Sequence, residues 1–177
     1  MALTVMMNTI PVSAASNSRS VNLANSFGTI KTTVSVGSYV YRGPLMMDYY
    51  FDSSVASQIS TTKSVKDHVL ALTLQKDGLQ GNLSAGVSSS GPSASASVSQ
   101  VNANVAKYTT GKSTAKSISI DTTNNYIHRS VFDVAGAFIV TPLAGVLSYF
   151  TITGTANTQA VIGGKTFANS CATTQYW

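Results

Sequence analysis

Over much of this chain, apolar residues alternate with hydroxyl-bearing or small polar residues, and this period of two most restricts how it can fold. Residues 93–99 read Ser-Ala-Ser-Ala-Ser-Val-Ser, and residues 83–88 alternate Leu, Ala and Val with Ser and Gly. Successive side chains of a strand point to opposite faces, whereas a helix places apolar residues three and four positions apart. The alternation therefore predicts half-buried β-strands.

The composition agrees with this prediction. The 177 residues include 26 Ser and 21 Thr but no Glu, and only 10% are charged. Ser and Thr compete with the helical backbone for hydrogen bonds, and Thr, Val, Ile and Tyr suit a pleated sheet. A helical bundle is disfavoured because its exposed faces normally carry Glu. The hydrophobic content of 44% excludes a disordered chain.

Some eight to ten short strands are expected, separated by turns rich in Gly, Pro and Asn. They are predicted at 27–41, 45–51, 68–75, 83–88, 93–99, 115–121, 137–141, 146–153, 159–162 and 166–168. A bulge is expected at Gly37, a bulge or a fresh strand after Ser99, and turns at 42–44, 76–78, 90–92, 122–125 and 163–165. Residues 53–66 are expected to form a short helix or a long loop, and 16–25 an extended lead-in. This pattern predicts a single-domain antiparallel β-sandwich over 16–177, with a small β-barrel as the alternative.

The first residues resemble an export signal. An apolar run at 2–12 is followed by Ser-Ala-Ala-Ser at 13–16, and small residues of this kind precede signal-peptidase cleavage. We therefore predict a signal peptide at 1–15, although no Lys or Arg precedes the run and a first strand is the alternative. Cys171 is the only cysteine, so no intramolecular disulfide forms. These features favour a secreted, extracellular protein of bacterial origin.

The formal charge of +5 does not by itself indicate a nucleic-acid partner. The eight lysines are scattered along the sequence, without a basic run or interleaved aromatic residues. We predict no nucleic acid as partner. Anionic polymers or lipid head groups at a cell surface fit a weak positive balance better.

Residues for catalysis are few. His68 lies beside Asp67 and His128 lies five residues before Asp133, but no Gly-x-Ser-x-Gly motif accompanies them. Cys171 with a histidine in an exported β-domain suggests the sortases, yet no Arg follows Cys171 as those enzymes require. Neither paired cysteines nor His-x-His or calcium-loop spacing is present, so no metal site and no cofactor are expected. We predict that the chain is not an enzyme, with a secreted hydrolase using one of the histidines as a lesser alternative.

The segment Asp48-Tyr49-Tyr50-Phe51-Asp52 is the densest group of carboxylate and aromatic side chains. Tyrosine rings stack on sugar faces, and carboxylates accept hydrogen bonds from sugar hydroxyls. Asp48, Tyr49, Tyr50 and Asp52 are therefore the candidate ligand-binding residues. The alternative is an aromatic core strand with polar ends.

Charge is absent from two long segments, 78–106 and 134–164. The first has the alternation of a hairpin and resembles, in style, the membrane-inserting hairpins of β-pore-forming toxins. The leading hypothesis is a secreted non-enzymatic protein that acts by binding or assembly at the cell surface or in extracellular matrix. Its expected partners are a cell-surface polymer, carbohydrate, a lipid surface or other copies of itself. The alternative is a membrane-active protein that inserts the hairpin at 78–106.

Overall fold

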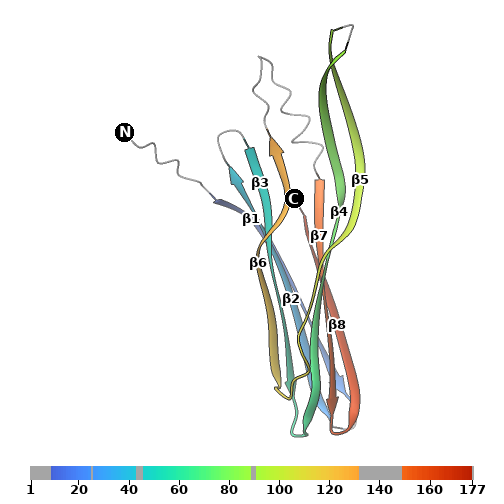
Figure 1. Ribbon diagram of the computed structural model, residues 1–177. Coiled ribbons are helices and arrows are strands. Elements are labelled where there is room, and N and C mark those ends of the chain that lie inside the picture. The colour runs from blue at the N-terminus through green and yellow to red at the C-terminus, as the bar shows by residue number, and fades with distance from the viewer. Residues whose placement is uncertain (1–8, 25, 43–45, 89–90, 132–148, 177) are drawn as a thin grey trace, which may run out of the picture.

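The computed structural model describes residues 9–24, 26–42, 46–88, 91–131 and 149–176, which form two antiparallel four-stranded sheets (Figure 1). The strands are β1 (Thr9–Leu23), β2 (Gly28–Arg42), β3 (Met46–Ser60), β4 (Val65–Ser88), β5 (Gly91–Thr109), β6 (Ser117–Val131), β7 (Tyr149–Ile162) and β8 (Lys165–Tyr176). Sheet A has the order β1-β2-β3-β6, and sheet B has the order β5-β4-β7-β8.

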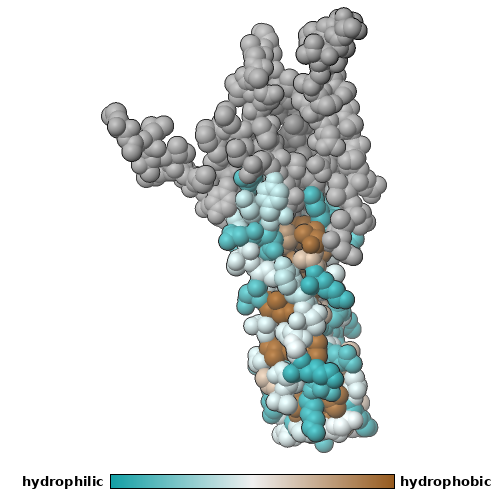
Figure 2. All heavy atoms as spheres, viewed as in Figure 1, coloured by the Kyte–Doolittle hydropathy of each residue, from teal (hydrophilic) through white to brown (hydrophobic). Residues whose placement is uncertain are grey.

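The predicted all-β sandwich is confirmed. The two sheets face each other and do not close into a barrel, so the alternative fold is wrong. Long strands make the sandwich narrow and elongated, with the β1–β2, β3–β4 and β7–β8 connections at one end (Figure 1). We call this end the foot. On the face that Figure 2 shows, polar and weakly polar residues cover most of the described surface, in agreement with the abundance of Ser and Thr.

The core lies between the sheets and follows the alternation along each strand. On β2, and on β4 from His68 to Leu74, the even-numbered positions face inward, and on β3 the odd-numbered positions do. The main cluster contains Val34, Val36, Phe51, Val55, Leu70, Leu72, Leu74, Ile152, Ala156 and Cys171. A second cluster near the foot contains Phe27, Ile30, Ile59, Val65, Ala160 and Ile162.

Hydrogen bonds between buried polar side chains also join the two sheets. The hydroxyls of Thr32 and Thr158 lie 2.9 Å apart, and Asn169 Nδ2 donates to Thr32 Oγ1 at 3.1 Å. Farther from the foot, Gln175 Nε2 donates to Ser38 Oγ at 3.3 Å. Burying a polar group without a hydrogen-bond partner costs free energy, so these contacts favour one alignment of the two sheets relative to each other.

Three predicted interruptions are wrong because strands continue through them. Residues 53–60 belong to β3, and only a short connection remains of the helix or loop expected at 53–66. Asp77 and Gly78 lie inside β4, where Gly78 is paired on both sides. The turn expected at 122–125 is a bulge in β6, because Asn124 adopts a left-handed conformation with φ of 55°. Asn tolerates this conformation, so the chain bends without reversing.

The turn at 163–165 is confirmed, because Gly163 and Gly164 have φ of 54° and 84° between β7 and β8. Of the turn expected at 90–92, Gly91 and Pro92 belong to β5, where they pair with Ser88 and Val87, and residue 90 lies outside the described residues. The bulge expected after Ser99 lies in β5 between Asn104 and Ala106. The bulge expected at Gly37 is not in β2, where Ser38 is buried like Val36; it lies opposite, in β1 between Pro11 and Ser13.

Residues 16–23 belong to β1 rather than to an unpaired lead-in. β1 starts at Thr9 and so includes part of the segment predicted as an export signal, which stays a prediction. The strand predicted at 137–141 and the first residues of the one at 146–153 lie outside the described residues.

Candidate ligand site

The four predicted ligand-binding residues divide between the two faces of β3. Asp48, Tyr50 and Asp52 occupy even positions and lie on the outer face of sheet A, where each is partly exposed. Tyr49 lies on the inner face and packs against the main core cluster. The structure therefore brings three of the four together on one surface and places Tyr49 with the core.

A row of three tyrosines crosses this outer face. The register pairs Tyr50 with Tyr39 of β2 on one side and with Tyr126 of β6 on the other. The rings of Tyr39 and Tyr50 are stacked, with centroids 5.6 Å apart, and Tyr126 meets Tyr50 edge to face at 5.4 Å. Tyr126 keeps 49% of its surface exposed, so the row offers an aromatic surface to solvent.

The bulge in β6 connects this row to Asp52. Asn124 donates its backbone N–H to Asp52 Oδ1 at 2.7 Å, and Tyr39 donates its hydroxyl to Asn124 Oδ1 at 2.5 Å. These two bonds hold one oxygen of the Asp52 carboxylate beside the tyrosines. Among the described residues none donates to Asp52 Oδ2, so this oxygen remains an acceptor for a ligand.

A shallow hollow of about 260 Å³ adjoins the tyrosine row. It is lined by Ser35, Gly37, Asp52, Ser53, Ser54, Asp121, Thr122 and Thr123. Gly37 is paired with Asp52 and has no side chain, which leaves space beside that carboxylate. Asp121 is exposed and has no ion-pair partner within the described ranges. We call this hollow together with Tyr39, Tyr50 and Tyr126 the tyrosine–aspartate patch.

The patch combines an aromatic surface, two carboxylates and several hydroxyls. Such a set can hold a polyhydroxylated ligand, because the carboxylates accept from ligand hydroxyls and an aromatic ring contacts the apolar C–H face of a sugar. Its negative charge favours neutral or cationic ligands over anionic ones. The described residues contain no group of three His, Cys, Asp or Glu side chains that could hold a metal ion.

Sequence reasoning did not find Tyr39, Asn124, Tyr126 or Asp121 as members of this patch. They come from β2 and β6, and only the strand pairing places them beside β3. The spacing of Tyr50 two residues from each aspartate was the usable signal, because residues two apart share a face.

The histidine considered for hydrolysis lies in the core. Both Ser57 and His68 have 0% exposure, and Ser57 Oγ lies 2.9 Å from His68 Nε2. His68 Nδ1 lies 2.7 Å from the carbonyl oxygen of Ala115, which can only accept, so Nδ1 carries the proton and Ser57 donates to Nε2. This serine–histidine pair is inaccessible to a substrate in the described fold. The side chains of His128 and Arg129 lie outside the described residues.

Cys171 is also enclosed. Its thiol donates to the carbonyl of Thr32 at 3.4 Å, and burial raises the pKa of the thiol from its ordinary value of 9.0. A protonated, buried thiol is a poor nucleophile.

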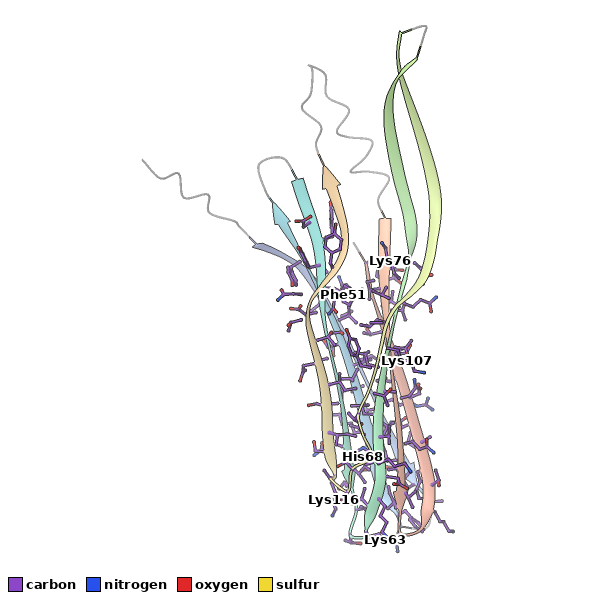
Figure 3. The ribbon with its side chains drawn as sticks, in the orientation of Figure 1. Phe51, Lys63, His68, Lys76, Lys107 and Lys116 are labelled. Carbon is purple, nitrogen blue, oxygen red and sulfur yellow. The ribbon has the colours of Figure 1, made fainter. Side chains whose placement is uncertain are left out.

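The lysines that are scattered in the sequence gather in space at the foot. The ammonium groups of Lys63 and Lys165 lie over the ring of Phe27, with Nζ 4.8 Å and 5.4 Å from the ring centroid. Lys116 Nζ donates to the carbonyl of Thr61 at 2.7 Å, and Figure 3 shows Lys63 and Lys116 at this end. The exposed lysines of this region are Lys31, Lys63, Lys66, Lys112, Lys116 and Lys165. Lysines that are far apart in the sequence therefore lie close together in the fold.

A larger hollow of about 460 Å³ lies beside strands of both sheets. Its lining is Arg19, Val21, Val69, Ala71, Asn157, Thr158, Gln159, Ala168, Asn169 and Ser170. It has no aromatic side chain and no carboxylate, so it lacks the features that distinguish the tyrosine–aspartate patch.

No protein-family model matches this chain, and no curated protein sequence shows significant similarity to it. None of the described residues belongs to a helix that is long and apolar enough to cross a membrane.

Proposed function

We propose that this chain is a secreted, non-enzymatic carbohydrate-binding protein, which binds neutral or amino-sugar polysaccharide at a cell surface through the tyrosine–aspartate patch. The observation that carries the proposal is the row of three tyrosines beside two carboxylates on the outer face of sheet A. Sugar-binding surfaces need both an aromatic contact and fixed polar groups, since hydroxyls alone are well hydrated in water.

The geometry supports a division of roles within the patch. Tyr126 is the most exposed ring and contacts the sugar face, while the stacked pair of Tyr39 and Tyr50 supports it. Asp52 is oriented by Asn124 and accepts from a ligand hydroxyl through Oδ2. Asp121 supplies the second carboxylate and attracts an amino group where the sugar has one.

The test is retardation of the protein during native electrophoresis through gels that contain a β-glucan, a mannan, chitosan or alginate. The expected result is retardation by a neutral polysaccharide or by chitosan. Alginate is the anionic control: the exposed lysines of the foot attract a polyanion, so any retardation by alginate should not depend on the patch.

Tyr126→Ala should weaken that binding about five- to thirtyfold, because one stacked ring contributes on the order of 1–2 kcal/mol and each 1.4 kcal/mol is tenfold in affinity. Tyr176→Ala is the matched control, since Tyr176 is a tyrosine with 60% exposure on β8 of the other sheet. Equal binding by both variants, or binding to none of these polymers, would contradict the proposal.

A further inference from the structure

Strands β4 and β5 continue beyond the strands that flank them. The pairing of β4 with β7 extends as far as Leu79 and Tyr149, whereas β4 and β5 remain paired from Gln80 with Ser99 to Ser88 with Gly91. Within the described ranges, residues 80–88 pair with β5 alone. Figure 1 shows this two-stranded segment projecting from the end opposite the foot. We call residues 80–88 and 91–99 the ribbon.

The register of the ribbon sorts its residues by polarity. Apolar or small positions pair with apolar or small ones: Gly81 with Val98, Leu83 with Ala96, Ala85 with Ala94 and Val87 with Pro92. Polar positions pair with polar ones: Gln80 with Ser99, Asn82 with Ser97 and Ser84 with Ser95. Since paired residues share a face, these positions give the ribbon one apolar and one polar face.

The apolar positions of the ribbon are not those that would extend the core. In the sandwich, β4 directs its even positions inward, among them Leu70, Leu72 and Leu74. On the β4 strand of the ribbon the apolar positions are odd, and the pairing of β4 with β7 has no shift between Val69 and Leu79 that would exchange the faces. The apolar positions therefore continue the outer face of sheet B, and packing against sheet A does not explain them.

The length and charge of the ribbon match the interior of a bilayer. Its strands are joined by nine register pairs, from Gln80 with Ser99 to Ser88 with Gly91. At about 3.3 Å per residue this is about 30 Å, and a membrane-crossing strand needs roughly 9–11 residues. The sequence carries no charge from Gly78 to Ala106. The charged residues that bound this segment are Asp77, three residues before the ribbon on β4, and Lys107, eight residues after it on β5, where Lys107 pairs with Thr73 inside the sandwich (Figure 3).

We propose that the ribbon is a membrane-inserting hairpin, which crosses a lipid bilayer with its apolar face toward lipid. A bilayer contains no water to satisfy backbone groups, so the outer edge of each strand must pair with the ribbon of another copy. The inserted state is therefore a ring of copies whose polar faces, rich in Ser and Asn, line an aqueous interior. This inference does not rest on the proposed carbohydrate binding.

The test uses the full chain and vesicles of phosphatidylcholine and phosphatidylglycerol loaded with a self-quenching dye. The expected result is dye release by the wild-type protein. Leu83→Arg, at the middle of the apolar face, should reduce release about tenfold or more, because an arginine at the bilayer midplane strongly opposes insertion. Ser84→Arg is the matched control: it adds the same charge one residue away on the polar face, and its release should stay within about twofold of wild type.

Circular dichroism of both variants establishes that they fold, so that a loss of release reports on insertion. Three outcomes overturn the proposal: intact vesicles with the wild-type protein, equal loss of release in both variants, or filaments formed without lipid and without release. The last outcome would identify the ribbon as a self-assembly surface. Because the vesicles contain no polysaccharide, failure here leaves the proposed carbohydrate binding unaffected.

Discussion

The buried pair of Ser57 and His68 makes a strong prediction about stability. Ser57 donates to His68 Nε2 at 2.9 Å, and both residues have 0% exposure. Ser57→Ala removes the only described donor to Nε2 and leaves a buried acceptor unpaired, which should cost about 1–3 kcal/mol of unfolding free energy.

His68→Leu leaves the Ser57 hydroxyl buried without its acceptor, and a similar loss of about 1–3 kcal/mol is expected. The carbonyl of Ala115, which His68 Nδ1 now satisfies, belongs to an exposed residue and can turn to water. Combining the two substitutions removes both members of the pair and leaves neither unpaired. The double variant should therefore be more stable than the sum of the two losses predicts, by about 1–2 kcal/mol.

The measurement is urea denaturation of the wild type, both single variants and the double variant. In thermal melts each single substitution should lower Tm by roughly 3–10 °C, since about 1 kcal/mol corresponds to 2–4 °C in a domain of this size. Ser60→Ala is the control on the same strand, because Ser60 is exposed, and it should stay within about 0.5 kcal/mol of wild type. Additive losses in the double variant would refute the reasoning, because they would mean that the two side chains are not coupled.

Three further predictions concern the core. Gly154→Ala should lower the unfolding free energy by about 1–3 kcal/mol, because a Cβ there would lie 2.9 Å from Val36 Cγ2 of the facing sheet. Gly111→Ala is the control: a Cβ at Gly111 would have nothing within 4 Å, so this variant should be nearly neutral in the same thermal melts. Asn169→Ala should lose about 1–3 kcal/mol in urea denaturation, because its amide donates to acceptors on both β1 and β2. For Cys171 the folded-state pKa is raised above 9.0, so the folded chain keeps a proton that the unfolded chain releases. The stabilising contribution of this thiol is present below pH 9 and is lost as the pH rises through the folded-state pKa. Between pH 7 and pH 10, Cys171→Ala should therefore lose less unfolding free energy than the wild type does. If wild type and variant lose the same unfolding free energy over this range, the pKa of Cys171 is not raised by burial.

The fold class could be predicted from the sequence because alternation is a local property. Leu70, Leu72 and Leu74 fall on one face of any strand that contains them, and all three are buried. The ends of the strands could not be predicted in the same way. Asp77 and Gly78 have the residue types of a hairpin turn, but pairing with β5 and β7 on both sides keeps them extended.

The candidate site was predictable only in part, for a related reason. Asp48, Tyr50 and Asp52 lie on one strand, so their common face follows from spacing alone. Tyr126 comes from a strand far along the chain, and its place beside Tyr50 depends on a bulge at Asn124 that shifts the register of β6. Local residue types do not specify such long-range pairing, which arises from packing of the whole sheet.

The lysines around Phe27 have a consequence for how copies of this protein would associate. A ring of ribbons requires all copies to point the same way, and their feet would then lie side by side. Each foot carries ammonium groups such as those of Lys63 and Lys165, so neighbouring copies repel one another at that end. Salt shortens the range of this repulsion to about 8 Å at physiological ionic strength. Association should therefore become stronger as ionic strength rises, in contrast to binding at an anionic surface, which salt weakens.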